Sequence, residues 1–247
     1  MAWFKTWFNT PYYHLLYQNR DFAEAENFIS KLISYLDIPE NSEIIDLACG
    51  KGRHSVFLNK LGYSVLGLDL SEESIAHNQE FEKSGIPYLK FEVHDMREPI
   101  DSSPVVLVVN LFTSFGYFES HEEDDAVFKS VYNVLKPGGI FVLDFLNEQY
   151  VKNTLVPQQE IIRGDITFDI RKRIENHHVI KDINFTDQNE DYHFFEQVKL
   201  HSQEEIEDFA KTNHFSVKNI FGDYHLNQFD RETSPRCIMV LVKEPQT

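Results

Sequence analysis

Cysteine is scarce in this sequence, which holds only Cys49 and Cys237 among its 247 residues. Two thiols cannot build the disulfide framework of a small secreted protein, and they form no zinc-binding cluster of cysteines. We therefore predict two reduced, buried thiols, a cytoplasmic location and no metal site.

Long apolar runs and a leader segment are also missing. The longest candidate, residues 105–111, has the length of a strand and falls far short of the ~20 residues that a membrane-spanning helix needs. Residues 1–7 contain neither a basic region nor a leucine-rich core, so we expect no signal peptide. These absences predict a protein that does not enter a membrane.

Basic residues are few relative to acidic ones. The 23 Lys and Arg residues face 40 Asp and Glu residues, which gives a net charge of −17. A surface this acidic repels phosphate backbones and anionic lipids, which argues against nucleic acid and membranes as partners. Apolar residues make up 42% of the chain, so we expect a folded core. The length suits one large domain, or one domain with an insertion.

The N-terminal region is rich in aromatic residues. Pro11 prevents a single helix across residues 1–20, whereas apolar residues at helical spacing predict a helix over 21–35. We interpret residues 1–38 as a helical, aromatic lid segment.

Strands and helices alternate through the middle of the chain. Short apolar strands are predicted at 43–48, 64–69, 88–93, 104–110 and 140–145. Strands that are separated by helices form a parallel sheet covered on both faces. Residues 39–147 are therefore predicted to form a doubly wound, Rossmann-like α/β core.

The pattern changes after Asn147. Three runs alternate apolar and polar residues, and they are 161–174, 179–185 and 192–200. Alternation of this kind predicts strands with one buried face, so we assign residues 148–200 to an antiparallel β-meander insertion.

The last part of the chain returns to the pattern of the core. Ser202 and Glu205 have the spacing of a capping box, which predicts the start of a helix. Apolar strands are predicted to follow at 215–221 and 237–242. We interpret residues 201–247 as the C-terminal part of the core.

Small residues follow the first strand of the predicted core. Residues 48–52 let the backbone approach a ligand closely, and the next helix begins with free N–H groups. Asp69 ends the second strand, where a carboxylate can accept hydrogen bonds from both hydroxyls of a ribose. The carboxyl ends of the strands form the usual ligand crevice in an open parallel sheet, so we predict a nucleoside site.

The loop departs from a dinucleotide fingerprint, which requires Gly-x-Gly-x-x-Gly. Ser55 stands at the third glycine position, and Ala48 replaces an earlier glycine. Asp46, just before the loop, favours a cationic amino group over a pyrophosphate. A nucleoside with an amino acid tail, S-adenosyl-L-methionine (SAM), fits these features.

Residues 46–54 resemble the first motif of class I SAM-dependent methyltransferases, with alanine at position 48 where glycine is commoner. Four further segments resemble later motifs of that family in the same order, and they are 67–71, 93–96, 110–117 and 135–139. The resemblance covers residues 40–147. It implies a seven-stranded sheet with an antiparallel last strand, and SAM as the cofactor.

The resemblance also assigns roles to individual residues. It places Asp46 near the methionine ammonium, Asp69 on the ribose and Asp95 at the adenine amino group. Asn110 and Phe112 would flank the sulfonium. The implied cofactor-binding residues are Asp46, Ala48, Gly50, Gly52, Asp69, Leu70, Asp95, Met96, Asn110 and Phe112.

Methyl transfer from a sulfonium is an in-line displacement, in which alignment alone can supply on the order of 7–11 kcal/mol. A general base helps when the nucleophile carries a proton, and the candidates for a catalytic residue are Tyr117, His14 and Tyr13. The sequence thus predicts a SAM-dependent methyltransferase that acts on a small-molecule acceptor such as an amine.

The aromatic N-terminal segment could cover that acceptor. Five of its residues are candidates for an aromatic cage around a cationic group, namely Trp3, Trp7, Tyr12, Tyr13 and Tyr17. We also consider a homodimer formed through the β insertion.

Other functions stay open at this point. They are an NAD-dependent oxidoreductase, a protein or tRNA methylase, and a protein that binds SAM without catalysis. Residues 110–113 lack the paired prolines of Asn-Pro-Pro-Tyr, a motif of many methylases that act on base amines and glutamine amides. This absence, together with the acidic charge, argues against nucleic acid as the acceptor.

Overall fold

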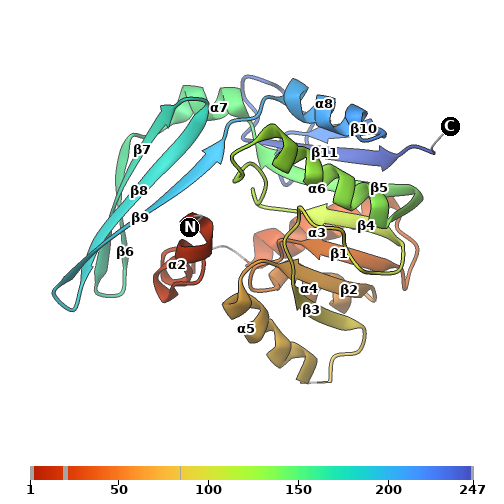
Figure 1. The fold of residues 1–247 in the computed structure, drawn as a ribbon, viewed down its shortest axis with the longest axis horizontal. Helices are drawn as coiled ribbons and strands as arrows, with labels where there is room; N and C mark the ends of the chain where they lie inside the picture. Colours follow the sequence, from red (N-terminus) through yellow and green to blue (C-terminus); the bar gives the residue numbers. More distant parts are fainter. Residues whose placement is uncertain (1–2, 19–21, 84, 246–247) are drawn as a thin grey trace.

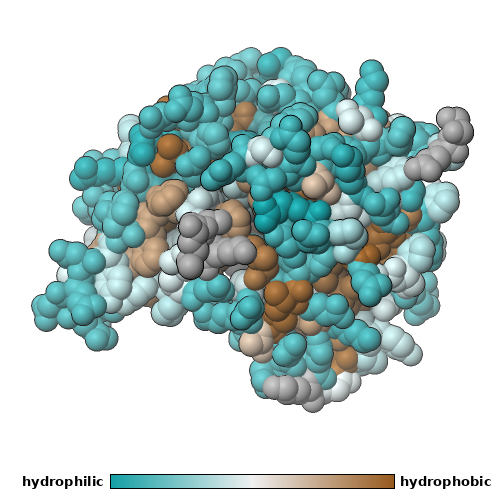
Figure 2. Space-filling view, in the orientation of Figure 1, coloured by the Kyte–Doolittle hydropathy of each residue, from teal (hydrophilic) through white to brown (hydrophobic). Residues whose placement is uncertain are grey.

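A computed structural model of the chain describes residues 3–18, 22–83 and 85–245. It consists of a layered α/β core and a smaller antiparallel sheet beside it, with N-terminal helices between the two (Figure 1). The face seen in Figure 2 is mainly hydrophilic, as the excess of acidic residues leads us to expect.

The core is built on a seven-stranded sheet. In spatial order its strands are β10 (Phe215–Phe221), β11 (Arg236–Lys243), β5 (Leu135–Leu146), β4 (Val105–Asn110), β1 (Glu43–Leu47), β2 (Ser64–Asp69) and β3 (Leu89–Val93). Neighbours from β5 to β3 are parallel, whereas β11 is antiparallel to both β5 and β10. The predicted doubly wound sheet is confirmed, and its strand order reverses between β1 and β4, where such sheets bind ligands.

Helices cover both faces of this sheet. They are α3 (Phe22–Leu36), α4 (Arg53–Lys60) and α5 (Glu72–Lys83) on one face, and α6 (His121–Val134) and α8 (Gln203–Thr212) on the other. Leu32, Leu58 and Ile75 bury one face, and Phe128 and Phe209 bury the other. None of the helices in the described ranges is long and apolar enough to cross a membrane.

The second sheet is inserted between β5 and α8, after the short helix α7 (Glu148–Thr154). Its strands are β6 (Gln158–Arg163), β7 (Ile166–Glu175), β8 (His178–Asp187) and β9 (Glu190–Lys199), each antiparallel to the next. The sequence pattern predicted three runs, but 161–174 is divided between β6 and β7. A tight turn at Gly164, whose φ of 56° is left-handed, joins the two strands, and the inward face shifts from odd positions such as Ile161 to even positions such as Ile166.

Two short helices, α1 (Trp3–Trp7) and α2 (Pro11–Leu16), lie between the second sheet and the core. Pro11 is the first residue of α2, where its missing N–H costs no helical hydrogen bond. Trp7 and Leu16 are buried against Phe168 and its neighbours in the second sheet.

Polar contacts hold these helices in place. Glu196 of β9 accepts hydrogen bonds from Trp7 Nε1 at 2.8 Å and from the Tyr17 hydroxyl at 2.6 Å. We refer to residues 3–18 together with 158–199 as the cap. The segment expected at 1–38 therefore contributes α1 and α2 to the cap, while α3 packs on the core.

Candidate active site

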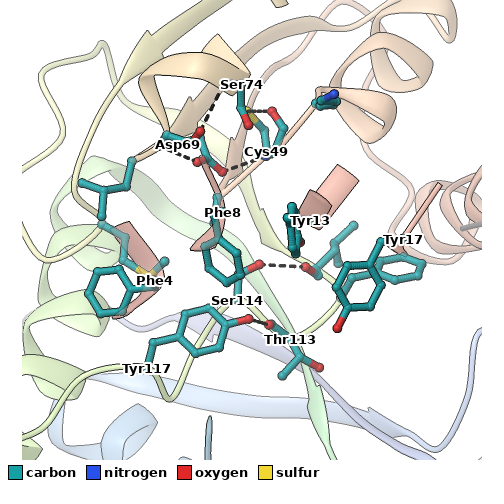
Figure 3. Close-up of a pocket in the computed structure, with 18 of the residues that line it drawn as sticks. Phe4, Phe8, Tyr13, Tyr17, Cys49, Asp69, Ser74, Thr113, Ser114 and Tyr117 are labelled. Carbon is teal, nitrogen blue, oxygen red and sulfur yellow. Dashed lines mark hydrogen bonds between the residues drawn. The ribbon is translucent and has the colours of Figure 1, made fainter. Parts of the chain in front are cut away.

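A cavity of about 390 Å³ lies between the carboxyl ends of the central strands and the cap. The core lines it with residues 48–51, 69–71 and 94–96, together with a turn after β4. The cap contributes aromatic side chains from α1 and α2. Figure 3 shows Asp69, Cys49 and Ser74 on one side of this space and the aromatic rings on the other.

The loop after β1 brings the backbone to the cavity because several of its residues have left-handed conformations. Ala48, Gly50 and Gly52 have φ values of 60°, 54° and 72°. A Cβ at Gly50 would meet no atom within 4 Å, so the loop leaves open space for a ligand beside its backbone. Burial raises the pKa of the neighbouring Cys49 thiol, which disfavours a thiolate nucleophile.

Asp69 is fixed at the end of β2 by two backbone hydrogen bonds. Its Oδ2 accepts from the Gly50 N–H at 2.8 Å, and its Oδ1 accepts from the Ser71 N–H at 2.8 Å. Burial raises the pKa of this carboxyl group. Each oxygen keeps a further lone pair, so the carboxylate can still accept hydrogen bonds from a vicinal diol.

Asp95, Met96 and Leu70 also line the cavity, next to Asp69. The Asp95 carboxylate is bound by Arg97, with Nε 3.0 Å from Oδ1 and Nη2 2.6 Å from Oδ2. Arg97 also contacts Glu123 on α6. The sequence analysis did not find Arg97, which fixes the acid that was predicted to read an adenine edge.

Three of the predicted cofactor-binding residues do not line the cavity. Gly52 forms the N-cap of α4, where a Cβ would meet the Phe91 ring at 2.9 Å. Asn110 is buried and donates from Nδ2 to the Leu47 carbonyl at 2.9 Å. Asn110 thus joins β4 to β1 through Nδ2, and its expected place beside a bound sulfonium stays a prediction.

Asp46 is the third of these residues, and it is buried behind the loop. It is 1% exposed and accepts a hydrogen bond from the Ser55 hydroxyl at 2.6 Å. Burial raises the pKa of this carboxyl group to about 6. Asp46 supports the loop from inside the core, and its expected place near a ligand ammonium stays a prediction.

The pKa of Asp46 leads to a prediction about stability. Between pH 3.8 and about 6, the Asp46 carboxyl group is protonated in the folded state and ionised in the unfolded state. Its contribution therefore opposes folding increasingly as the pH rises through this range. Asp46→Asn removes this titration while retaining an acceptor for Ser55. We expect the unfolding free energy of the variant, relative to the wild type, to rise by about 2 kcal/mol between pH 4 and pH 7.

Urea denaturation at several pH values measures this difference. Asp101→Asn, at an exposed position, is the matched control and should show no comparable trend. A wild-type and Asp46→Asn difference that stays constant from pH 4 to pH 7 contradicts the prediction.

The cap side of the cavity is aromatic. Phe4, Phe8, Tyr13, Tyr17 and Tyr117 line it, and Figure 3 shows their rings gathered opposite Asp69. The Tyr117 hydroxyl donates to the Thr113 carbonyl, and its ring packs on Phe4 and Phe8. Among the predicted catalytic residues, Tyr117, Tyr13 and His14 all line this space.

The cage predicted from the sequence is only partly assembled. Trp7 is 1% exposed and bonded to Glu196, and the Tyr12 hydroxyl donates to Asp187 at 2.8 Å. Trp3 supports Tyr117 by an edge-to-face contact. The lining therefore lacks three of the predicted cage residues, Trp3, Trp7 and Tyr12, which corrects the prediction. It includes Phe4 and Phe8, which were missed because aromatic spacing alone does not tell which rings face a cavity.

Few charged side chains line the cavity. Apart from Asp69 and Asp95, the charged side chains among the described lining residues are Lys51 and Arg53. The aromatic side of the cavity, where a cage for a cationic group was predicted, therefore includes no carboxylate.

His14 is the remaining polar group on the aromatic side. Burial, with help from Lys51 and His77, lowers the pKa of its imidazole to about 4. Its Nε2 is buried and has no hydrogen-bond partner within the described part of the chain. A neutral imidazole of this kind can accept a hydrogen bond from a ligand.

Comparison with known proteins agrees with this geometry. A family model described as a methyltransferase domain matches residues 38–199. YqeM of Bacillus subtilis is 37% identical over 131 residues, which cover 51% of this chain and 53% of the relative. A dTDP-3-amino-3,4,6-trideoxy-alpha-D-glucopyranose N,N-dimethyltransferase of Streptomyces venezuelae is 32% identical over 134 residues, covering 53% of this chain and 54% of the relative. The matches span about half the length of these curated relatives.

Solved structures extend the likeness in fold to nearly the whole chain. An S-adenosylmethionine-dependent methyltransferase from Clostridium acetobutylicum superposes with a TM-score of 0.79 at 18% identity, over 95% of this chain and 96% of that one. The likeness therefore includes the cap as well as the core. The resemblance to class I SAM-dependent methyltransferases is confirmed, and the chain belongs to the methyltransferase domain family.

Proposed function

We propose that this protein transfers a methyl group from SAM to a neutral amine on a small molecule. The observation that carries the proposal is the single cavity in which a polar half, built by Asp69 and the loop 48–51, meets an aromatic half under the cap. The polar half suits a ribose and an amino acid tail. The aromatic half excludes water from the reacting atoms.

SAM supplies an activated methyl group, whose C–S bond breaks as the acceptor nitrogen forms the new N–C bond and sulfur keeps the electron pair. The chain has only to bind and align the two reactants. Asp69 accepts hydrogen bonds from the ribose, and Ala48 and Gly50 bring backbone groups to the amino acid tail. Leu70 and Met96 supply apolar surface for the base.

Two observations support an amine as the acceptor. The relative from Streptomyces venezuelae is named as an N,N-dimethyltransferase of an amino sugar. The aromatic half of the cavity has His14, which is neutral at pH 7, and includes no carboxylate, while Lys51 of the loop and Arg53 of α4 add cations to the lining. These groups favour the uncharged form of an amine, which is the nucleophilic form. In our proposal His14 accepts a hydrogen bond from the acceptor N–H, while Tyr13 and Tyr117 pack on the acceptor.

The size of the cavity and its position under the cap favour a small acceptor over a protein or tRNA. The net charge of −17 supports the same choice. A cytoplasmic location and a homodimer formed through the sheet of residues 158–199 stay predictions. Gel filtration with light scattering tests the homodimer.

The function is tested by incubating the purified protein with methyl-labelled SAM and a metabolite extract fractionated into amines, acids and neutral compounds. We expect label in the amine fraction and S-adenosylhomocysteine as the second product. A parallel thermal-shift assay compares SAM with NAD, and we expect stabilisation by SAM. Stabilisation by NAD instead, or SAM binding without label transfer to any fraction, contradicts the proposal.

A further inference from the structure

A buried polar cluster lies beside the cavity, at the carboxyl end of β5, and does not line the cavity itself. Its centre is Asp144, whose side chain is fully buried. Arg236 binds Asp144 Oδ1 through Nε at 2.7 Å and through Nη2 at 2.7 Å. The Tyr224 hydroxyl donates to Oδ2 at 3.2 Å.

This cluster reaches the cavity through the turn after β4. Phe112 and Thr113, which line the cavity, have φ values of 61° and 62°. Two consecutive non-glycine residues in the left-handed region are strained and persist only where their surroundings hold them. Strain that is maintained next to a cavity indicates a functional constraint.

Asp144 and Arg236 supply the contacts that hold this turn. Asp144 Oδ2 accepts from the Phe112 N–H at 2.8 Å, and the Asp144 carbonyl accepts from the Thr113 N–H at 3.2 Å. Arg236 Nη2 donates to Thr113 Oγ1 at 2.7 Å. The ion-paired side chains thus bond the Phe112 backbone and the Thr113 hydroxyl, while the Asp144 backbone bonds the Thr113 N–H.

The side chain of Phe112 is fixed as well. Its ring stacks on Tyr224 with centroids 4.8 Å apart and on His54 with centroids 4.9 Å apart, and the Arg53 guanidinium lies 4.0 Å from its centroid. Tyr224 therefore links the buried carboxylate to the ring that faces the cavity.

We propose that Asp144, Arg236 and Tyr224 are positioning residues, which hold the turn 112–113 in the conformation that aligns the methyl acceptor with SAM. The proposal rests on the proposed function. The cluster touches neither reactant, so its loss should affect alignment more than binding. A cluster that only ties β11 to β5 would affect stability alone.

The test compares Asp144→Asn and Arg236→Met with Val240→Ala, a buried core variant on the same strand as Arg236 that leaves the cluster intact. SAM affinity is measured by calorimetry, and kcat and KM are measured with the acceptor found by label transfer. Hydrogen exchange with mass spectrometry follows the amides of residues 111–114. All variants are also compared by thermal unfolding.

We expect kcat to fall about 10- to 100-fold in both cluster variants, because small misplacements of reactants are costly. KM and the SAM dissociation constant should change less than about threefold, since the groups that bind the reactants are retained. The amides of 111–114 should exchange faster. Arg236→Lys, which keeps the charge, should recover part of the lost kcat, and Val240→Ala should lower the melting temperature without these effects.

The proposal is overturned if kcat falls no further in the cluster variants than in Val240→Ala. If no acceptor is found, the exchange experiment decides: faster exchange at 111–114 supports positioning and assigns the failure to the proposed function, whereas unchanged protection overturns the inference. Should Asp144→Asn fail to fold, Tyr224→Phe serves instead, because it removes one hydrogen bond and keeps the ring on Phe112. The same comparisons then apply with a smaller expected loss of kcat.

Discussion

Replacing Asp69 by alanine is expected to raise the dissociation constant of SAM by about 100- to 1,000-fold, because charge-assisted hydrogen bonds to two ribose hydroxyls are lost. The carboxylate also holds the Gly50 and Ser71 N–H groups at 2.8 Å each. Its removal therefore frees the loop that approaches the amino acid tail. Both consequences act in the same direction on affinity.

Calorimetric titration with SAM and with S-adenosylhomocysteine measures the effect. Both compounds carry the same ribose, so Asp69→Ala should weaken both by a similar factor. Glu92→Ala removes an exposed carboxylate from the neighbouring strand β3 and is the matched control for net charge. A SAM affinity that is equal in Asp69→Ala and Glu92→Ala would refute the assignment of this crevice.

The core could be predicted from the sequence because its signals are local. Apolar strands such as 105–110, together with helices between them, dictate a parallel sheet, and Gly50 and Asp69 mark the ends of two strands that this sheet brings together. The turn at Gly164 was missed because Ile162, which is exposed, continues the spacing of Ile166 and Phe168, although the buried face shifts from odd to even positions across the turn. Local spacing therefore predicts which elements form, and it fails where an exposed apolar residue extends the pattern.

The cap side of the site depends on contacts between distant residues, which spacing does not reveal. Glu196 binds Trp7 and Tyr17, from which it is separated by 189 and 179 positions in the sequence. Phe4 and Phe8 turn toward the cavity only because this docking fixes α1. The role of Asp144 also depends on contacts with distant residues, because its neighbours in the sequence are those of an ordinary strand residue.

Asp46 shows that the direction of a side chain is also hidden from the sequence. An acid next to a glycine-rich loop indicates a ligand contact when only the sequence is considered. In the fold its carboxylate points into the core and accepts from Ser55, where burial raises its pKa to about 6. The direction of a side chain at the end of a strand depends on the fold around it. Asp46 points into the core, whereas Asp69 lines the cavity.

His14→Phe is expected to lower kcat/KM for the amine acceptor by about 10- to 100-fold, because the acceptor N–H loses its partner in a desolvated cavity. His14→Gln retains an acceptor atom and should recover part of the loss. His193→Phe, at an exposed position of the second sheet, should leave the rate unchanged. SAM affinity should be equal in all four proteins, which separates this effect from a change in the cofactor half.

The pH dependence provides a stricter test of the same role. Only the neutral imidazole accepts a hydrogen bond, and the pKa of about 4 keeps His14 neutral above pH 5. The ratio of wild-type to His14→Phe kcat/KM cancels the titration of the acceptor itself. We expect this ratio to be constant from pH 8 to pH 5 and to fall toward one as the pH drops through 4. A ratio that already falls with a midpoint near 6.5, the ordinary pKa of histidine, would show that His14 is solvated and does not face the acceptor.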